Sequence, residues 1–139
     1  MQREQIDNLI VNLITIQEFS KDIHYTCHGE GFFGKHLLVD KFDFSDDIDL
    51  LKECCLLGND ERPHPSVEYL DRVVELMETM IPNNKNDKDN FIILHDFINN
   101  VLIEVNAMQD LTKADENVIG GIAQKLQQYK GLINLQIEE

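Results

Sequence analysis

Apolar side chains recur three and four residues apart along most of the chain, which is the spacing of one buried face of an α-helix. The first such run comprises Ile6, Leu9, Ile10, Leu13, Ile16, Phe19 and Ile23. It predicts a first helix from about Arg3 to Cys27. Several glycines follow, and they predict a tight turn before the next helix.

A second helix is predicted from Gly31 or Phe32 to Leu57, where Gly58 ends it. The predicted helix contains an internal start signal. Ser45 is followed by two aspartates, which is the pattern of an N-cap residue with acids in the first helical turn. We therefore expect this helix to be kinked or split at Ser45.

Three further helices are predicted in the second half of the chain. A polar turn precedes a shorter helix from Ser66 to about Met80, and a solvated loop separates it from a helix from about Asn90 to Leu111. A short connector with capping residues at 112–115 leads to a last helix from about Glu116 to Ile137. The apolar stripe predicted for the shorter helix is Val67, Leu70, Val73, Val74 and Met77.

Four long helices and one shorter helix, joined by short loops, predict an all-α fold of the helix-bundle type. The chain has 139 residues, which suits a single domain over residues 1–139 with one core. Its 42% hydrophobic content is that of an ordinary globular protein. The scarcity of chain breakers, with 3 prolines and 7 glycines, favours long helices over many short strands.

Compartment and membrane association follow from what the sequence lacks. No apolar run reaches the length of a membrane span, and the N-terminus lacks a signal-peptide pattern. The three cysteines, Cys27, Cys54 and Cys55, form neither an even disulfide set nor a CxxC motif. We interpret them as small apolar residues in a reducing compartment. The sequence therefore predicts a cytoplasmic protein without a membrane partner.

The formal net charge of -14 narrows the choice of partners. Such a chain repels phosphate backbones, and the short arm before the first helix carries a single base, Arg3. We therefore expect no DNA binding. An acidic surface attracts cations, which fits a protein that handles metal ions but also fits solubility alone.

The residues with the clearest chemistry flank the predicted glycine turn. His36 and Asp40 are four apart, so they share one face of the second helix. His24 lies across the turn, and all three side chains are expected to reach one space. Imidazole and carboxylate ligands suit iron, with zinc or manganese as alternatives. His95 and Asp96 are a weaker candidate pair, because adjacent residues on a helix are expected to face apart.

The same stretch resembles the miniferritins, the Dps proteins of the ferritin-like superfamily. The positions that carry the resemblance, at the family's spacing without a gap, are His24, Tyr25, Gly29, Phe32, His36, Asp40 and Phe42. The order of predicted helices matches this family over nearly the whole chain. The resemblance implies a ferritin-like four-helix bundle, with a shorter extra helix in the connection between the second and third long helices.

By this resemblance, the chain is expected to be a ferroxidase that oxidises Fe(II) with peroxide or oxygen. It would store the iron in a hollow homo-dodecamer and so protect against oxidative damage. The family's site lies between two subunits, and His24, His36 and Asp40 match the ligands of the first subunit. No catalytic residue beyond the metal ligands is expected. Gly120 and Gly121 in the last helix would let another helix approach closely, which suits a subunit contact.

For the partner subunit's half of the site, the resemblance calls for an Asp and a Glu, eleven and fifteen residues after the first Asp. Those positions hold Leu51 and Cys55, which cannot serve an iron site, whereas Asp49 and Glu53 lie two residues earlier. On an unbroken helix this shift rotates the acids by about 200° away from Asp40. A break in the helix would correct the rotation.

Without such a break, Asp43 and Asp47 become the better ligands, because they stay on the helical face of His36 and Asp40. The second half of the site is thus open between two acid pairs, or absent. Its absence would leave a non-catalytic ferritin-like helical protein with a structural or interaction role.

Overall fold

The computed structural model describes residues 3–23, 42–56, 66–80, 87–109 and 111–138. Every regular element within these ranges is a helix, so the predicted all-α fold is confirmed for this part of the chain. In chain order the elements are α1 (Arg3–Ile23), α3 (Ser45–Leu50), the π-helical turn η2 (Leu51–Leu56), α4 (Ser66–Met80), α5 (Asp87–Asn106) and α6 (Lys113–Glu138). None of these helices is long and apolar enough to cross a membrane.

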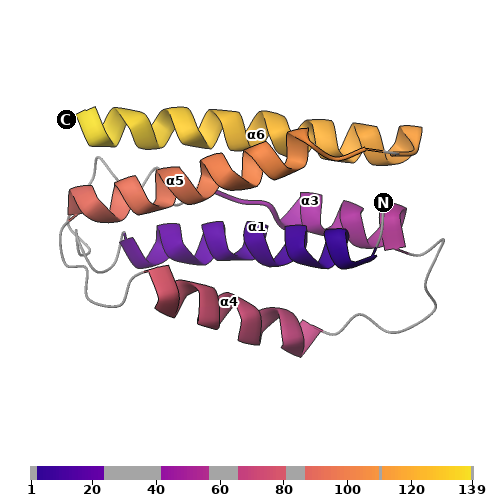
Figure 1. Cartoon of the computed structure of the whole chain (residues 1–139), viewed down its shortest axis with the longest axis horizontal. Coiled ribbons are helices and arrows are strands. Elements are labelled where there is room, and N and C mark those ends of the chain that lie inside the picture. Colours follow the sequence, from indigo (N-terminus) through magenta and orange to yellow (C-terminus); the bar gives the residue numbers. More distant parts are fainter. Residues whose placement is uncertain (1–2, 24–41, 57–65, 81–86, 110, 139) are drawn as a thin grey trace.

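The long helices lie roughly side by side, and α6, α5, α1 and α4 follow one another across the view in Figure 1. α5 and α6 run in opposite directions and share the most extensive contact. α1 packs against both α5 and α4, while α3 and η2 pack against α6 and η2 also reaches α1. The described residues therefore form a helical bundle, with α4 attached to the outer side of α1.

α1 is the central helix of this arrangement. Its predicted apolar positions from Ile6 to Phe19 are buried, and so are Val11 and Thr15 on a different side of the helix. The Thr15 hydroxyl donates to the Val11 carbonyl oxygen at 2.7 Å, so its burial leaves no unmet polar group. Burial on several sides follows from contact with α4, α5 and η2 at once.

A helix begins where the internal start signal of the predicted second helix indicated. Residues 42–44 are not helical, and α3 begins at Ser45. Ser45 is the first helical residue and not the N-cap, which is Phe44. The Asp43 carboxylate accepts a hydrogen bond from the Ser45 N–H at 2.9 Å and thereby satisfies one free donor at the helix start. The predicted helix before residue 42 lies outside the described residues.

The last two helices begin earlier than predicted. α5 spans Asp87–Asn106, whereas the periodicity predicted 90–111, and α6 spans Lys113–Glu138. The start of α6 is set by two reciprocal hydrogen bonds. The Thr112 hydroxyl oxygen accepts the Asp115 N–H at 3.1 Å, and the Asp115 carboxylate accepts the Thr112 N–H at 3.4 Å. This capping box makes the residue after Thr112 the first of the helix.

α4 has its predicted bounds, but the predicted apolar stripe is only partly buried. Val73 and Tyr69 are buried and Met77 is half-buried, whereas Leu70 is 57% and Val74 is 54% exposed. α4 packs mainly against α1, so a narrow stripe is enough to attach it. Leu70 and Val74, two positions of the predicted apolar stripe, are therefore not buried by the other described residues.

The capping box gives a first prediction. Thr112→Ala removes the hydroxyl that accepts the Asp115 N–H, and we expect it to lower the free energy of unfolding by about 1 kcal/mol. Urea unfolding followed by circular dichroism measures this loss. Thr79→Ala is the matched control, because the Thr79 hydroxyl only bonds to the Glu75 carbonyl oxygen on an exposed helix surface. Equal losses in the two variants would contradict the capping role.

Candidate functional site

Three of the predicted metal ligands, His24, His36 and Asp40, lie outside the described residues. The acids predicted for the second half of the site are described, and they lie on α3 and η2 or directly before them. In the part of the chain that the structure describes, no three His, Cys, Asp or Glu side chains gather as a metal-binding group. The described acids are therefore assessed by what each contacts.

Aromatic packing fixes the chain directly before α3. Phe42 and Phe44 are buried, and their ring centroids lie 4.7 and 5.2 Å from that of Tyr129 on α6. The Gln17 side-chain oxygen on α1 accepts a hydrogen bond from the Phe44 N–H. The non-helical residues 42–44 thus join α1 to α6, and their apolar–polar–apolar order turns both rings inward.

An ion pair fixes the first turn of α3 against α6. Lys125 Nζ lies 2.6 Å from Asp47 Oδ2 and donates to the Asp43 carbonyl oxygen at 3.1 Å. The same ammonium lies 5.9 Å from the centroid of the Phe44 ring. Asp47 is 8% exposed, so its charge needs this partner. The Tyr129 hydroxyl lies 3.3 Å from both the N–H and the carbonyl oxygen of Asp43.

The surroundings of Asp43, Lys125 and Tyr129 shift the pKa values of these three side chains. The Ser45 N–H, which donates to the Asp43 carboxylate, lowers the pKa of Asp43 from its ordinary value. Burial alone would lower the pKa of Lys125, but the hydrogen bond and the charge of Asp47 together outweigh burial and raise that pKa. Burial raises the pKa of Tyr129, against the opposing effect of its contact with the Asp43 backbone.

Asp43 and Asp47 do not form the ligand pair that a continuous helix would give. Residues 42–44 are not helical, so the two acids do not stack one turn apart on one helix. The Asp47 carboxylate is bonded to Lys125, and the Asp43 carboxylate caps the Ser45 N–H. A metal ion at Asp47 would have to displace the lysine.

Asp49 and Glu53, unlike Asp43 and Asp47, have carboxylates without a partner among the described residues. Both side chains are exposed, and neither makes a hydrogen bond or ion pair with the described residues. Asp49 lies on α3 and Glu53 lies within the π-helical turn η2, so their four-residue spacing is not that of a regular α-helix. Leu50 beside them is 42% exposed. The exposed surface of α3 and η2 therefore carries two carboxylates that are unpaired within the described residues.

His95 and Asp96 do not face apart as predicted. His95 Nδ1 lies 3.4 Å from Asp96 Oδ1, although the residues are adjacent on α5. His95 Nε2 is buried and has no hydrogen-bond partner within the described residues. The contact is long and Asp96 is largely exposed, so the pair forms at most a weak ion pair.

A comparison with protein-family models found no match, and searches among curated proteins and solved structures likewise found none. The functional argument therefore rests on the residues of this chain.

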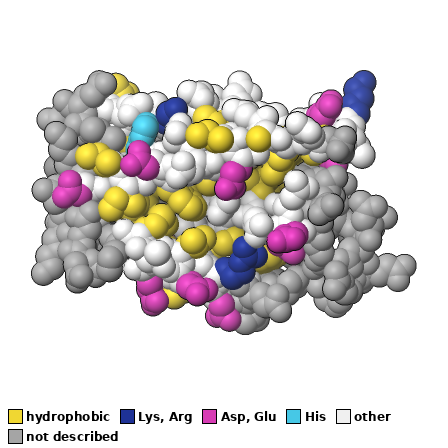
Figure 2. Space-filling view, in the orientation of Figure 1, with side chains coloured by type: hydrophobic (Ala, Val, Ile, Leu, Met, Phe, Trp, Pro, Cys, Tyr) yellow, Lys and Arg dark blue, Asp and Glu magenta, His cyan; other side chains and the backbone are white. Residues whose placement is uncertain are grey.

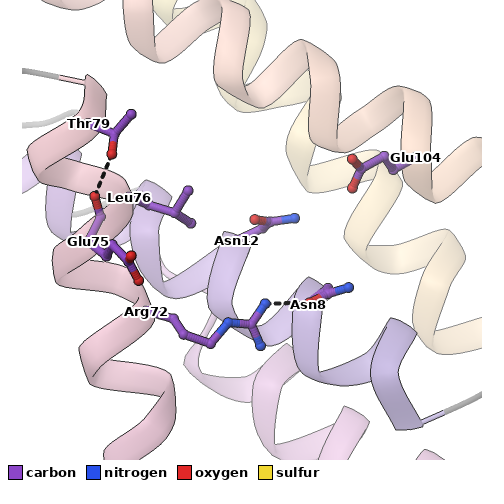
Figure 3. A pocket seen from close by; sticks show the side chains of 7 residues that line it. All are labelled: Asn8, Asn12, Arg72, Glu75, Leu76, Thr79 and Glu104. Carbon is purple, nitrogen blue, oxygen red and sulfur yellow. Dashed lines mark hydrogen bonds between the residues drawn. The ribbon is translucent and has the colours of Figure 1, made fainter.

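Sequence reasoning missed a groove between α1, α4 and α5 (Figure 3). A signal for it was present. Asn8 and Asn12 are four apart, so they share one face of the helix and interrupt its apolar positions with amides. Nothing local in the sequence indicated which helices would flank that face.

The buried carboxylate gives a second prediction. Lys125→Met leaves Asp47 without its partner, and we expect a loss of about 1–2 kcal/mol in the free energy of unfolding at pH 7, between the values for exposed and buried pairs. Lys21→Met is the control, because Lys21 pairs with Glu18 at the surface and its loss should cost far less. Similar losses in both variants would contradict the role of the Lys125 ion pair.

The raised pKa values of Lys125 and Tyr129 give a third prediction. A group whose pKa is higher in the folded state stabilises the fold below its unfolded pKa, and that stability is lost as the pH rises through the folded pKa. The ordinary values are 10.5 and 10.0, so the free energy of unfolding should fall above about pH 10. Tyr129→Phe should make this fall shallower in urea titrations between pH 8 and 11. An unchanged slope would contradict the burial effect.

Proposed function

We propose that this chain is a miniferritin-like protein that oxidises Fe(II) and stores the product in a closed homo-oligomer. The observation that carries the proposal is the motif of the resemblance, with His24, His36 and Asp40 at the family's spacing. In the sequence the motif follows α1 (Arg3–Ile23) and precedes α3, which begins at Ser45.

The partner subunit's half of the proposed site is assigned to Asp49 and Glu53. Both carboxylates are exposed and unpaired within the described residues, as ligands that complete a site on another subunit must be. Asp47 is not assigned, because its charge is already used by Lys125. The non-helical residues 42–44 remove the reason for expecting a rotation of about 200° along one helix.

The chemistry asked of these ligands is modest. Imidazole and carboxylate groups hold Fe(II) while open positions on the ion admit the oxidant. With peroxide, two Fe(II) ions each give up one electron. The two electrons and two protons reduce one hydrogen peroxide to two waters. The net charge of -14 favours the approach of Fe(II) and disfavours DNA, so protection by DNA binding is not part of the proposal.

A second candidate is a non-catalytic helical protein that binds a partner and has an incomplete metal site. The acids two residues away from the family's positions favour it. The lack of a three-ligand group within the described residues is compatible with it. The two candidates differ in whether the wild-type protein accelerates Fe(II) oxidation.

The fourth prediction tests the site. We expect His36→Ala and Asp40→Ala each to abolish rapid oxidation of Fe(II), followed by the absorbance of the ferric product with peroxide or oxygen supplied. Asp49→Ala and Glu53→Ala should also impair it. Asp46→Ala is the matched control, because Asp46 is another exposed acid of α3 with no proposed ligand role. Parallel titrations with zinc and manganese test the metal.

If the wild-type protein oxidises Fe(II) no faster than buffer, the ferroxidase proposal is wrong and the non-catalytic, partner-binding candidate is favoured. If Asp46→Ala loses as much activity as Asp49→Ala, then Asp49 and Glu53 are not the ligands of the partner subunit's half of the metal site. Circular dichroism of each variant separates loss of ligands from loss of fold.

The fifth prediction tests assembly. A Cβ atom at Gly120 or Gly121 meets nothing within 4 Å, so alanine at either position should stabilise the isolated chain by about 0.5–1 kcal/mol. If these glycines form a subunit contact, Gly120→Ala should instead reduce the proportion of oligomer measured by light scattering. Gly131→Ala on the same helix, with equally open space, is the control. A wild-type monomer at micromolar concentration would contradict a site shared between subunits.

A further inference from the structure

The groove between α1, α4 and α5 has the size of a ligand site. Its main cavity is about 440 Å³ and a second cavity of about 320 Å³ adjoins it. Asn8 and Glu104 line both cavities, so the two form one continuous groove above α1. Pockets of roughly 300–1,000 Å³ are typical of small-molecule sites. On the molecular face in Figure 2, apolar side chains run along the middle and acidic ones lie around them.

The two walls of the groove each carry a carboxylate. Glu75 projects from α4 and Glu104 from α5, on either side of α1 (Figure 3). Both are exposed, and neither carboxylate has a hydrogen-bond or ion-pair partner among the described residues. Arg72 also lines the groove, but its guanidinium donates to the Asn8 side-chain oxygen on α1. The groove thus keeps two unpaired negative charges on opposite walls.

Between the two carboxylates, the groove is lined by one amide side chain and several apolar side chains. The Asn12 side chain is half-buried and makes no hydrogen bond within the described part of the chain. Half-buried Leu76 lies beside it, and Val105 and Met108 line the adjoining cavity. A guest that satisfies this lining must present cationic donors at its ends and an apolar chain between them.

We propose that the groove binds a linear aliphatic diamine or polyamine. One ammonium group pairs with Glu75 and another with Glu104, and the Asn12 side-chain oxygen accepts an N–H from the guest. The methylene chain between the ammonium groups lies over Leu76. The net charge of -14 raises the local concentration of such cations. Arg72 opposes binding, because it places a like charge beside the guest.

The test is isothermal titration of the full-length protein with spermidine, at low and at physiological salt. We expect one spermidine per chain, with affinity falling as salt rises. Glu75→Gln and Glu104→Gln should each weaken binding about three- to fivefold, and Asn12→Leu should weaken it as well. Glu78→Gln is the matched control, because it removes an exposed charge of α4 that lines neither cavity. Arg72→Gln should strengthen binding, because it removes the like charge.

Three results would overturn the proposal. A loss in Glu78→Gln equal to that in Glu104→Gln would mean diffuse attraction to an acidic surface. Weaker spermidine binding by a correctly folded Arg72→Gln would mean that the arginine attracts what the groove binds, which excludes a guest held through its ammonium groups. Binding of a lysine-rich peptide without binding of free spermidine would make the groove a protein-docking surface. The titration contains no iron, so its outcome is independent of the proposed ferroxidase activity.

Discussion

The contact of Lys125 with Asp47 holds the start of α3, and the non-helical residues 42–44 before it, against α6. Residues 42–44 are not helical, so their backbone groups lack the hydrogen bonds that a helix would supply. Side chains from other elements replace these bonds, including Gln17 from α1 and Tyr129 from α6. Lys125 completes the set by bonding to both a backbone oxygen and a buried carboxylate. Residues 42–44 are therefore fixed by polar contacts from α1 and α6 as well as by the packing of the Phe42 and Phe44 rings.

The same contacts show why the sequence predicted some features and not others. The spacing of apolar residues identified the buried face of α1 and the bounds of α4, because both depend on residues one or two turns apart. The start of a helix at Ser45 was also a local signal. The pairing of Asp47 with Lys125 joins residues 78 positions apart, and no local pattern predicts it. The exposure of Leu70 likewise depends on how many helices surround α4, which periodicity does not encode.

For the candidate site, the sequence supplied the types of ligand and the structure separates the acids by environment. Asp47 and Asp49 are only two residues apart and look equivalent in the sequence. One is buried against a lysine, and the other is exposed and unpaired within the described residues. This distinction depends on which side of α3 faces α6. It narrows the proposed second half of the metal site to Asp49 and Glu53.

The attachment of α4 has a consequence for the dynamics of the chain. This helix packs mainly against α1, leaves two large apolar side chains in solvent, and forms one wall of the groove. Elements with few buried contacts open at lower free energy than the rest of a fold, as a cooperative unit. The amide protons of α4 should therefore exchange with solvent sooner than those of the central α1. A guest that bridges α4 and α5 would suppress this opening. Filling the groove should therefore slow the exchange of the α4 amide protons.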